Sequence, residues 1–539
     1  MKKFSMFLFL IFILTWIGVY AGITENPETY NIKEYGAQGT GKELDTKYIQ
    51  KTIDDCEKNG GGTVFFPPGI FLSGTLYLKN NVNIHLSKGA TLLGSPDIID
   101  YPENNSHFHF YNSLVTKHSL IYGENLSNIS IVGKGVIDGQ GGSFPEHSRI
   151  KPDRYKNRPF IIRFIRCDNV TIKDITLKNS AMWMQHYLAC DHVKVQGIKV
   201  YNHCNKNNDM IDIDGCHDVI ISDCFGDTDD DGITFKSTSA RSCKNISVSN
   251  CVISSHCNAI KFGTESNGGF ENITVLNCII RPSKNDTLIY GKPTGISGIS
   301  LEIVDGGIMD GINISDIVMD GPEVPVFVRL GNRGRKYKED METPPVGVLR
   351  NIRISNIIAK NAGVTGCSVT GVENNHVENI SLENIYISCS GGNKEKLKVS
   401  DVSEMEKNYP EATMFGTLPS YGLFIRHVNG IYLKDIKFDY VTGDNRPAVI
   451  CDNVSDITIQ NLNAKTEPDI TGLILLRNSQ NAFIHGNSLR TSVNTYISIE
   501  GEQTRNINIS GNNLKNAESI YKVSKGALES EVNSKSNKY

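Results

Sequence analysis

The sequence predicts an all-β protein, a right-handed parallel β-helix (a solenoid) with a helix capping its N-terminal end. Two observations predict this fold. One strand pattern recurs along most of the 539 residues, and neighbouring copies without long insertions start about 23 to 28 residues apart. A helical apolar spacing stands out near the N-terminus, where a solenoid needs a cap.

Each copy of the repeat begins with Asn, Asp or His and continues with alternating apolar residues. Examples are NVTIKDITLKNS from Asn169, DVIISDCFGD from Asp218, NISVSNCVISS from Asn245 and NITVLNCIIRP from Asn272. Period-two alternation indicates strand, and so short a repeat leaves no room for a crossover helix. Each strand must therefore stack on its equivalent in the next coil, with turn Asn residues in ladders of side-chain hydrogen bonds. Leucine-rich repeats are the competing fold, but their Leu spacing and helices are missing.

The ends of the chain differ from the repeat. Residues 1–21 are basic and then apolar, typical of a secretory signal peptide, with a membrane anchor as the alternative. Residues 45–58 have helical spacing with Asp45 as N-cap, within an N-terminal cap at about 28–70. The β-helix domain is expected over 22–522, interrupted by a loop or lid at about 394–421, with a loose polar tail at 523–539.

Composition excludes several partners. The formal net charge of −4 gives no indication of the positively charged surface that binds nucleic acid or an anionic membrane. Six of the 13 Cys residues recur beside similar strand motifs, which favours packed thiols over a disulfide framework. The sequence contains no CxxC pair, so a zinc site is not expected. We expect an exported monomer, secreted or periplasmic, that needs no cofactor.

One turn, GDTDDDGITFKS at 226–237, contains four carboxylates, at Asp227, Asp229, Asp230 and Asp231. Asp209 lies about one coil earlier, so its turn is expected to stack on this one. Crowded carboxylates raise at least one pKa, and glycoside hydrolysis needs a protonated acid beside ionised ones. The alternatives are a Ca²⁺ site and a solvated turn without function. Asp212 and Asp214 share one face and are interpreted as structural.

Four segments resemble glycoside hydrolase family 28, the polygalacturonase family. They are NIKEYGAQGTG at 31–41, GGGTVFFPPGIFLSGTLYL at 60–78, GKGVIDGQGG at 133–142 and the run at 158–186. The family's Asn-x-Asp motif maps onto Asn207, Asn208 and Asp209. Its Asp-Asp pair maps onto Asp230 and Asp231, followed in register by Ile233, Lys236 and Ser237. The resemblance implies an inverting mechanism in which Asp230 is the general acid and Asp209 and Asp231 activate water.

Two family motifs are altered. The family's His falls on Cys257, with His256 one place away as a substitute in a bulged turn. The Arg-Ile-Lys that grips a substrate carboxylate is replaced by Ser300, Leu301 and Glu302, and Glu302 is expected to repel a uronate. Arg329, Arg333, Arg335, Arg426 and Lys261 are the candidate replacement cations, each with a structural role as the alternative. Trp183 and His186 are expected to line the sugar cleft.

The leading hypothesis is a glycoside hydrolase that acts on an acidic plant-type or algal polysaccharide, pectic or otherwise uronate-containing. Because the usual uronate grip is missing, plain homogalacturonan is expected to be a poor substrate for internal cleavage, and exo action is favoured. A Ca²⁺-dependent β-helix lyase and a non-catalytic carbohydrate-binding β-helix are the alternatives. The lyase would need a basic residue that the altered motif no longer supplies.

Overall fold

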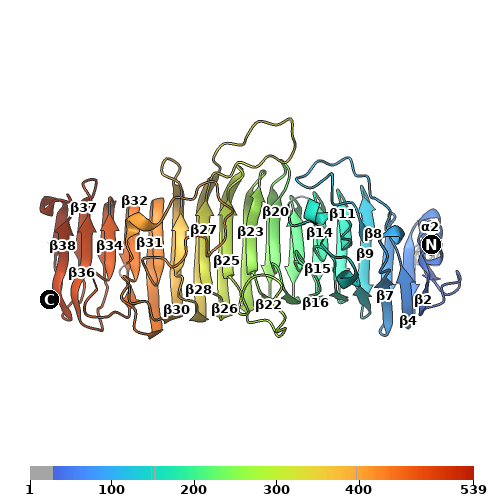
Figure 1. Ribbon diagram of the computed structural model, residues 1–539, viewed down its shortest axis with the longest axis horizontal. Helices are drawn as coiled ribbons and strands as arrows, with labels where there is room; N and C mark the ends of the chain where they lie inside the picture. Colours follow the sequence, from blue (N-terminus) through green and yellow to red (C-terminus); the bar gives the residue numbers. More distant parts are fainter. Residues whose placement is uncertain (1–27, 147, 151–152, 396, 471) are drawn as a thin grey trace, which may run out of the picture.

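The computed structural model describes residues 28–539 except 147, 151–152, 396 and 471. The chain coils into a right-handed parallel β-helix, a long stack of coils with the N-terminus at one end and the C-terminus at the other (Figure 1). The pairings between its strands are parallel. The predicted signal peptide at 1–21 lies outside the described residues.

Three rows of strands run along the stack. The site sheet contains β5 (Leu76–Tyr77), β8 (Ser119–Glu124), β11 (Phe160–Ile165), β14 (Gln185–Leu188), β17 (Ile211–Asp214), β20 (Ile233–Ser237), β23 (Asn258–Ser266), β25 (Ser297–Ile303), β27 (Val324–Leu330), β29 (Cys367–Thr370), the start of β31 (Leu423–Thr442), the start of β32 (Val449–Gln460), β34 (Ile474–Arg477), β36 (Val493–Glu500) and β38 (Ala517–Ser524).

The second row contains β1 (Thr29–Asn31), β3 (Gly62–Phe66), β6 (Val82–Leu86), β9 (Ser127–Gly133), β12 (Asp168–Lys173), β15 (Asp191–Gln196), β18 (His217–Ser222), β21 (Cys243–Ser249), β24 (Phe270–Ile280), β26 (Ile308–Asp320), β28 (Val348–Ala362), β30 (Val377–Gly391), parts of β31 and β32, β35 (Gln480–His485), β37 (Arg505–Ser510) and β39 (Val532–Lys535). The third row contains β2 (Thr40–Leu44), β4 (Gly69–Ser73), β7 (Ala90–Gly94), β10 (Val136–Asp138), β13 (Thr176–Lys178), β16 (Lys199–Asn202), β19 (Phe225–Thr228), β22 (Val252–Ser255), the ends of β24, β26, β28, β30 and β31, and β33 (Asn463–Ala464). The pairings of β2 with β4, β20 with β23 and β28 with β30 contain a register shift.

The interior and the turns confirm the interpretation of the repeat. Inward Val, Ile, Leu and Cys side chains form one continuous core along the stack. At the turns, Asn169 adopts a positive φ and donates its side-chain amide to Asn128, which donates in turn to Asn81. All 13 Cys lie in the described part of the chain and all are free thiols, 12 of them buried. The expectation of packed thiols is confirmed.

The N-terminal cap is α2 (Thr46–Lys58), which buries Ile49, Ile53 and Cys56 against the first coils. Asp45 is the N-cap residue, as predicted, but its side chain forms no capping hydrogen bond with the helix. Its carboxylate instead accepts hydrogen bonds from the amides of Gln38 and Gly39, which hold the preceding loop.

The loose tail predicted at 523–539 is wrong. β38 runs to Ser524, and β39 stacks on β37 with Asn533 donating to Asn508 at 3.0 Å. The segment is polar, but it keeps the period-two alternation and the ladder residues of the repeat, so it continues the coil.

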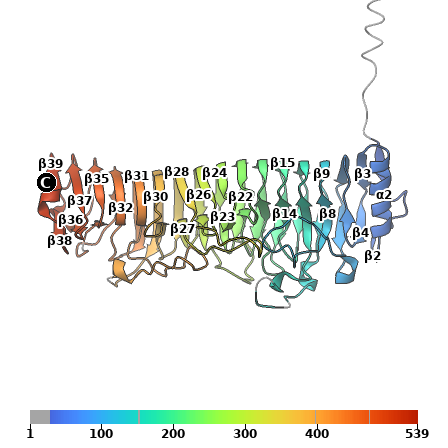
Figure 2. The same ribbon diagram turned by 90° about the horizontal axis from the view of Figure 1, so that it is seen from above.

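Long loops leave one side of the stack (Figure 2). They include the segments 101–118, 139–159, 281–296, 331–347 and 392–422, whose described residues form little regular structure beyond single 3₁₀ turns. The predicted insertion at about 394–421 falls in the last of these. In the described part of the chain, no helix combines the length and apolar character that a bilayer span requires.

Candidate active site

Three carboxylates from two successive coils meet where β17 and β20 begin. Ile211 pairs with Ile233, so Asp209 and Asp231, each two residues earlier, stack one coil apart. Asp230 is fixed by its backbone amide, which donates to the side-chain oxygen of Asn208 at 2.9 Å. The stacking predicted from repeat length is confirmed.

Two buried lysines balance these carboxylates. Lys236 Nζ lies 3.3 Å from Asp209 Oδ2 and 3.2 Å from Asp212 Oδ1, and it sits 4.5 Å from the centre of the Trp183 ring. Lys261 Nζ lies 3.0 Å from Asp231 Oδ2. The opposite oxygen of Asp231 accepts the side-chain amide of Asn258 at 2.8 Å. Asp231 is thereby held between a cation and an amide donor.

The remaining two carboxyls are pushed towards their protonated forms. Burial, together with the adjacent Asp231 carboxylate, raises the pKa of Asp230. Burial and then the charge of Asp212 raise the pKa of Asp209 well above its ordinary range, against the opposing effect of Lys236. A partly exposed acid of raised pKa beside an ion-paired carboxylate is the combination that acid–base catalysis uses.

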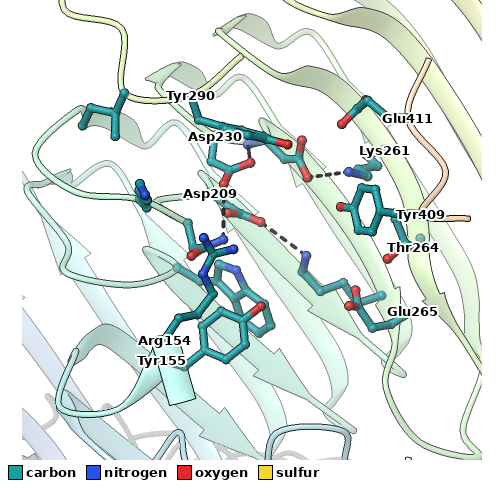
Figure 3. Close-up of a pocket in the computed structure, with 17 residues that line it drawn as sticks. Arg154, Tyr155, Asp209, Asp230, Lys261, Thr264, Glu265, Tyr290, Tyr409 and Glu411 are labelled. Atoms are coloured by element: carbon teal, nitrogen blue, oxygen red, sulfur yellow. Dashed lines mark hydrogen bonds and ion pairs between the residues drawn. The ribbon is translucent and has the colours of Figure 1, made fainter. Parts of the chain in front are cut away.

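The carboxylates face a cavity of about 380 Å³. Seven predicted site residues line it: Asp209, Asp230, Asp231, Asn207, Lys236, Lys261 and Trp183. Figure 3 shows Asp230 and Asp209 near its centre, with Arg154 and Tyr155 on one side and Lys261, Tyr409 and Glu411 on the other. The site therefore combines side chains of the coils with side chains from loops.

Asp227 and Asp229, the other acids of the turn, bind the loop at 281–296. Asp227 accepts hydrogen bonds from His203, the Ser283 hydroxyl and the Lys284 amide. Asp229 accepts the amides of Ile289 and Tyr290 at 2.8 and 2.9 Å. The clustering of acids in one turn thus has two purposes, because neighbouring carboxylates either face the cavity or hold the loop that carries Tyr290 to its rim.

His256 does not line the cavity, so its predicted catalytic position is wrong. It is buried, with Nδ1 2.8 Å from Asp229 Oδ1 and Nε2 3.2 Å from the carbonyl oxygen of Asn285. It therefore supports the same loop from behind. Cys257, at the family's His position, is buried with its pKa raised far above the ordinary range by burial.

We expect Asp229→Asn to loosen this loop, because an amide cannot accept hydrogen bonds from both backbone amides and from His256 at once. Unfolding free energy should fall by about 1 to 3 kcal/mol, and KM should rise as Tyr290 loses its position. Limited proteolysis within 281–296 measures the loosening of the loop, and steady-state kinetics measure the rise in KM. Asp286→Asn, at an exposed position of the same loop, is the control. Unchanged cleavage and KM in Asp229→Asn would contradict the loop-holding role.

Two groups of described side chains have the spacing of a metal site. One is His203, Asp229 and His256, and the other is Asp230, Asp231 and Cys257. In the first, Asp229 is already bonded to two loop amides and His256 faces two oxygen atoms. In the second, Lys261 already pairs with Asp231. Metal-independence of the catalytic step stays a prediction.

Glu302 was expected to repel a uronate, but in the structure its side chain does not face the cavity. Its side chain is fully buried below Gly263 and accepts the Ser300 hydroxyl at 2.7 Å. Burial raises the pKa of Glu302 to about 8, against the opposing effect of Lys261. At neutral pH the group is mostly protonated and shielded from the cavity.

The protonated state of Glu302 predicts a pH dependence of stability. Between the ordinary pKa of 4.5 and the folded value of about 8, the folded state holds a proton that the unfolded state has lost. The stabilisation is therefore complete below 4.5 and is lost as pH rises through 8, at about 1.4 kcal/mol for each pH unit. Urea unfolding of Glu302→Gln from pH 5 to 9 should show a flatter decline than the wild type. An exposed control, Glu373→Gln, should decline like the wild type. Parallel curves for all three proteins would refute the assignment.

The predicted arginines do not line the cavity. Arg329 donates to the carbonyl oxygens of Gly371 and Glu404, and Arg426 donates to those of Val399 and Val402. Arg333 pairs with Asp305 and donates to Thr264. Arg329 and Arg426 thus hold the loop at 392–422, and Arg333 supports a cavity-lining turn. Their guanidinium groups are used inside the protein and are not available to a substrate carboxylate.

His186 also lies outside the cavity, contrary to expectation. It is fully buried, with Nε2 3.0 Å from Asp214 Oδ2 and its ring stacked on Phe160. His186 lies on the outer face of β14, in register with Arg163 and Asp212, and the rings of Phe110, Phe160 and Trp183 cover it there.

Several cavity residues were missed by the sequence analysis. Glu265 lies near the end of β23, and the others lie on loops or turns: Arg154, Tyr155, Lys206, Tyr290, Tyr409 and Glu411. Tyr409 and Glu411 belong to the loop at 392–422. The sequence predicts a loop or lid there, and this was the one indication that residues of the segment reach the site. The sequence around the other loop and turn residues shows no period-two pattern, because the position of a loop does not follow from the repeat of the coil.

Comparison with known proteins identifies the family to which the chain belongs. The model of glycosyl hydrolases family 28 matches residues 78–408, more than half of the chain. A probable polygalacturonase of Vitis vinifera is 30% identical over 227 residues, 40% of this chain and 46% of that protein. An exo-poly-alpha-D-galacturonosidase of Dickeya chrysanthemi is 28% identical over 261 residues, 39% of this chain and 42% of that protein. The chain therefore aligns with less than half the length of these relatives.

Two solved structures share the fold. A hyperthermoactive exopolygalacturonase from Thermotoga maritima superposes with a TM-score of 0.57 and 24% identity, covering 68% of this chain and 89% of that one. A family 28 exopolygalacturonase from Yersinia enterocolitica gives a TM-score of 0.59 and 18% identity, covering 81% and 78%. The matched segment includes every residue of the carboxylate cluster, and the chain belongs to glycosyl hydrolase family 28.

Proposed function

We propose that the protein hydrolyses glycosidic bonds of a pectic or other uronate-containing polysaccharide by an inverting acid–base mechanism. The observation that carries this is the convergence of Asp209, Asp230 and Asp231 on one cavity, with Lys236 and Lys261 beside them. The two relatives, a probable polygalacturonase and an exo-poly-alpha-D-galacturonosidase, point to the same class of substrate.

The proposed roles follow from the local environments. Asp230, whose pKa is raised, donates its proton to the glycosidic oxygen as the leaving sugar departs. Asp231, ion-paired with Lys261, accepts a proton from a water molecule, and Asp209, paired with Lys236, helps to activate that water by holding it in place. Water attacks the anomeric carbon on the face opposite the leaving group, so the product has inverted configuration.

We further propose that cleavage occurs at chain ends. Tyr409 and Glu411 reach the cavity from the loop at 392–422, although that loop leaves the stack several coils further on. Arg154 and Tyr155 approach from the preceding coils, and Tyr290 comes from the loop at 281–296. Loops from both directions along the stack narrow the groove to a pocket, which suits a terminal sugar better than a continuous chain.

Export of the protein, to the outside of the cell or to the periplasm, belongs to the same proposal. Its support is the basic and then apolar segment at 1–21 and the polymeric substrate, which is too large to enter a cell intact.

Product analysis tests the proposal. Wild-type protein and Asp230→Asn are incubated with polygalacturonate and with pectic fragments that contain neutral sugars, with and without a chelator. We expect reducing ends to appear without unsaturated products, independently of chelation, with little loss of viscosity, and with inverted anomers by NMR. Unsaturated products that require Ca²⁺ would establish the lyase alternative. Binding without any cleavage would establish a carbohydrate-binding module.

A further inference from the structure

The cavity contains four cationic side chains among its described residues, and they divide into two unlike pairs. Lys236 and Lys261 are 6% and 3% exposed, and each is bound to catalytic carboxylates. Arg154 and Lys206 are 20% and 36% exposed. Arg154 lies on the side of the cavity away from Tyr409 and Glu411 (Figure 3), and Lys206 is joined to Arg154 through Glu146. Only the second pair is open to a ligand.

Arg154 and Lys206 share a single carboxylate. Glu146 accepts Arg154 Nε at 3.0 Å on one oxygen and Lys206 Nζ at 2.9 Å on the other. Two positive charges against one negative charge leave one positive charge in excess at the cavity wall. Both cations have unused N–H groups, because a guanidinium has five and an ammonium has three.

A buried guanidinium holds this pair in place. Arg158 is 1% exposed and donates to the backbone carbonyls of both Arg154 and Lys206. It also donates to Ala181 O at 2.9 Å and to the Asn207 side chain at 3.4 Å, next to Asp230. The two cations are therefore fixed relative to each other and to the catalytic acid before any substrate arrives, which lowers the entropic cost of binding.

We propose that Arg154 and Lys206 bind the carboxylate of one uronate unit of the substrate, in place of the Arg-Ile-Lys motif that the chain lacks. This inference rests on the proposed hydrolase function and adds the residues that recognise the acid. The guanidinium and the ammonium form charge-assisted hydrogen bonds with the carboxylate, and they do so on the other side of Asp230 from Ser300 and Glu302.

The opposite wall has a different character. Tyr409 and Glu411 line it, and burial raises the pKa of Glu411. The cation on this side, Lys261, is already paired with Asp231. This wall suits hydroxyl groups of an uncharged sugar better than a second carboxylate. The site thus takes one uronate beside a neutral or esterified sugar, in preference to two free uronates.

The test compares Arg154→Gln and Lys206→Gln on a uronate-containing pectic oligosaccharide and on its carboxyl-reduced form. We expect KM for the uronate form to rise about 10- to 100-fold in each variant, with kcat changed much less. KM for the carboxyl-reduced form should match the wild type. Lys156→Gln removes the same charge from an exposed neighbouring position and should behave like the wild type on both. Wild-type KM should also be lower for a mixed uronate and neutral-sugar fragment than for an oligogalacturonate.

The outcomes separate the two proposals. A wild-type protein that cleaves no pectic substrate refutes the hydrolase function itself. A wild-type protein that cleaves, with variants whose KM is unchanged or rises equally on both forms, refutes the carboxylate site alone. Should one variant fail to fold, calorimetric binding of the uronate oligosaccharide to Asp230→Asn, with and without the other substitution, decides the matter. A loss of affinity of at least about 10-fold supports the site, and equal affinities refute it.

Discussion

Asp230→Asn is expected to lower kcat about 100- to 10,000-fold while leaving the unfolding midpoint within error of the wild type. Asn keeps the size of the side chain and the acceptor for the Asp231 amide, which Asp230 Oδ1 binds at 3.0 Å. It cannot give a proton to the leaving sugar. Removing one member of a crowded carboxylate group also relieves repulsion, so no stability should be lost.

Two comparisons sharpen this prediction. An aryl glycoside with a good leaving group needs little acid assistance, so its hydrolysis should fall far less than that of a natural oligosaccharide. Asp340→Asn, at a position whose side chain is 78% exposed, should leave both rates unchanged. A residual rate above about a tenth of the wild-type rate on the natural substrate would remove Asp230 from the role of acid.

Lys236→Met is expected to produce the largest loss of stability, about 3 to 5 kcal/mol. Methionine fills most of the volume over Trp183, but it leaves the carboxylates of Asp209 and Asp212 buried without their cation. Burial already raises the pKa of Asp212 to about 7, and Lys236 is the main influence that opposes this. Catalysis should fail as well, because Lys236 would no longer hold Asp209 in position beside the water.

Chemical denaturation measures the effect, and a second substitution identifies its cause. Adding Asp212→Asn to Lys236→Met should recover part of the lost stability, since it removes one uncompensated charge. Lys525→Met, which breaks an ion pair whose lysine is 71% exposed, should cost less than about 1 kcal/mol. A Lys236→Met protein as stable as Lys525→Met would show that the buried pairs contribute nothing net.

The two substitutions divide the site into separable parts. The Asp230 side chain accepts the Asp231 amide and forms no ion pair among the described contacts, whereas Lys236 pairs with two acids and keeps them in place. The Arg154 and Lys206 pair adds a third part, which concerns binding alone. Kinetics of the three sets of variants should therefore fall into distinct classes: kcat only, stability with kcat, and KM only.

Much of this architecture could be predicted from the sequence because the β-helix is a periodic fold. The strand spacing determines that Asp209 and Asp231 stack, since residues one coil apart become neighbours. The same regularity placed Lys236 and Lys261 beside them, and it indicated the Asn ladders and the packed thiols. It failed at the C-terminus, where a polar composition concealed one more coil.

What the sequence by itself determined is therefore the coil, the stacking of the carboxylates proposed as catalytic, and the absence of the Arg-Ile-Lys motif. Only the tertiary structure decided which charged residues are open to a ligand. Arg329, Arg333 and Arg426 had the right chemistry but are used to hold loops and turns, and Glu302 lost its charge through burial. Arg154 and Lys206 gained a role because Arg158 binds both of their loops. The physical reason is that strand neighbours follow from the repeat length, whereas the solvation and partners of loop residues depend on contacts between segments distant in sequence.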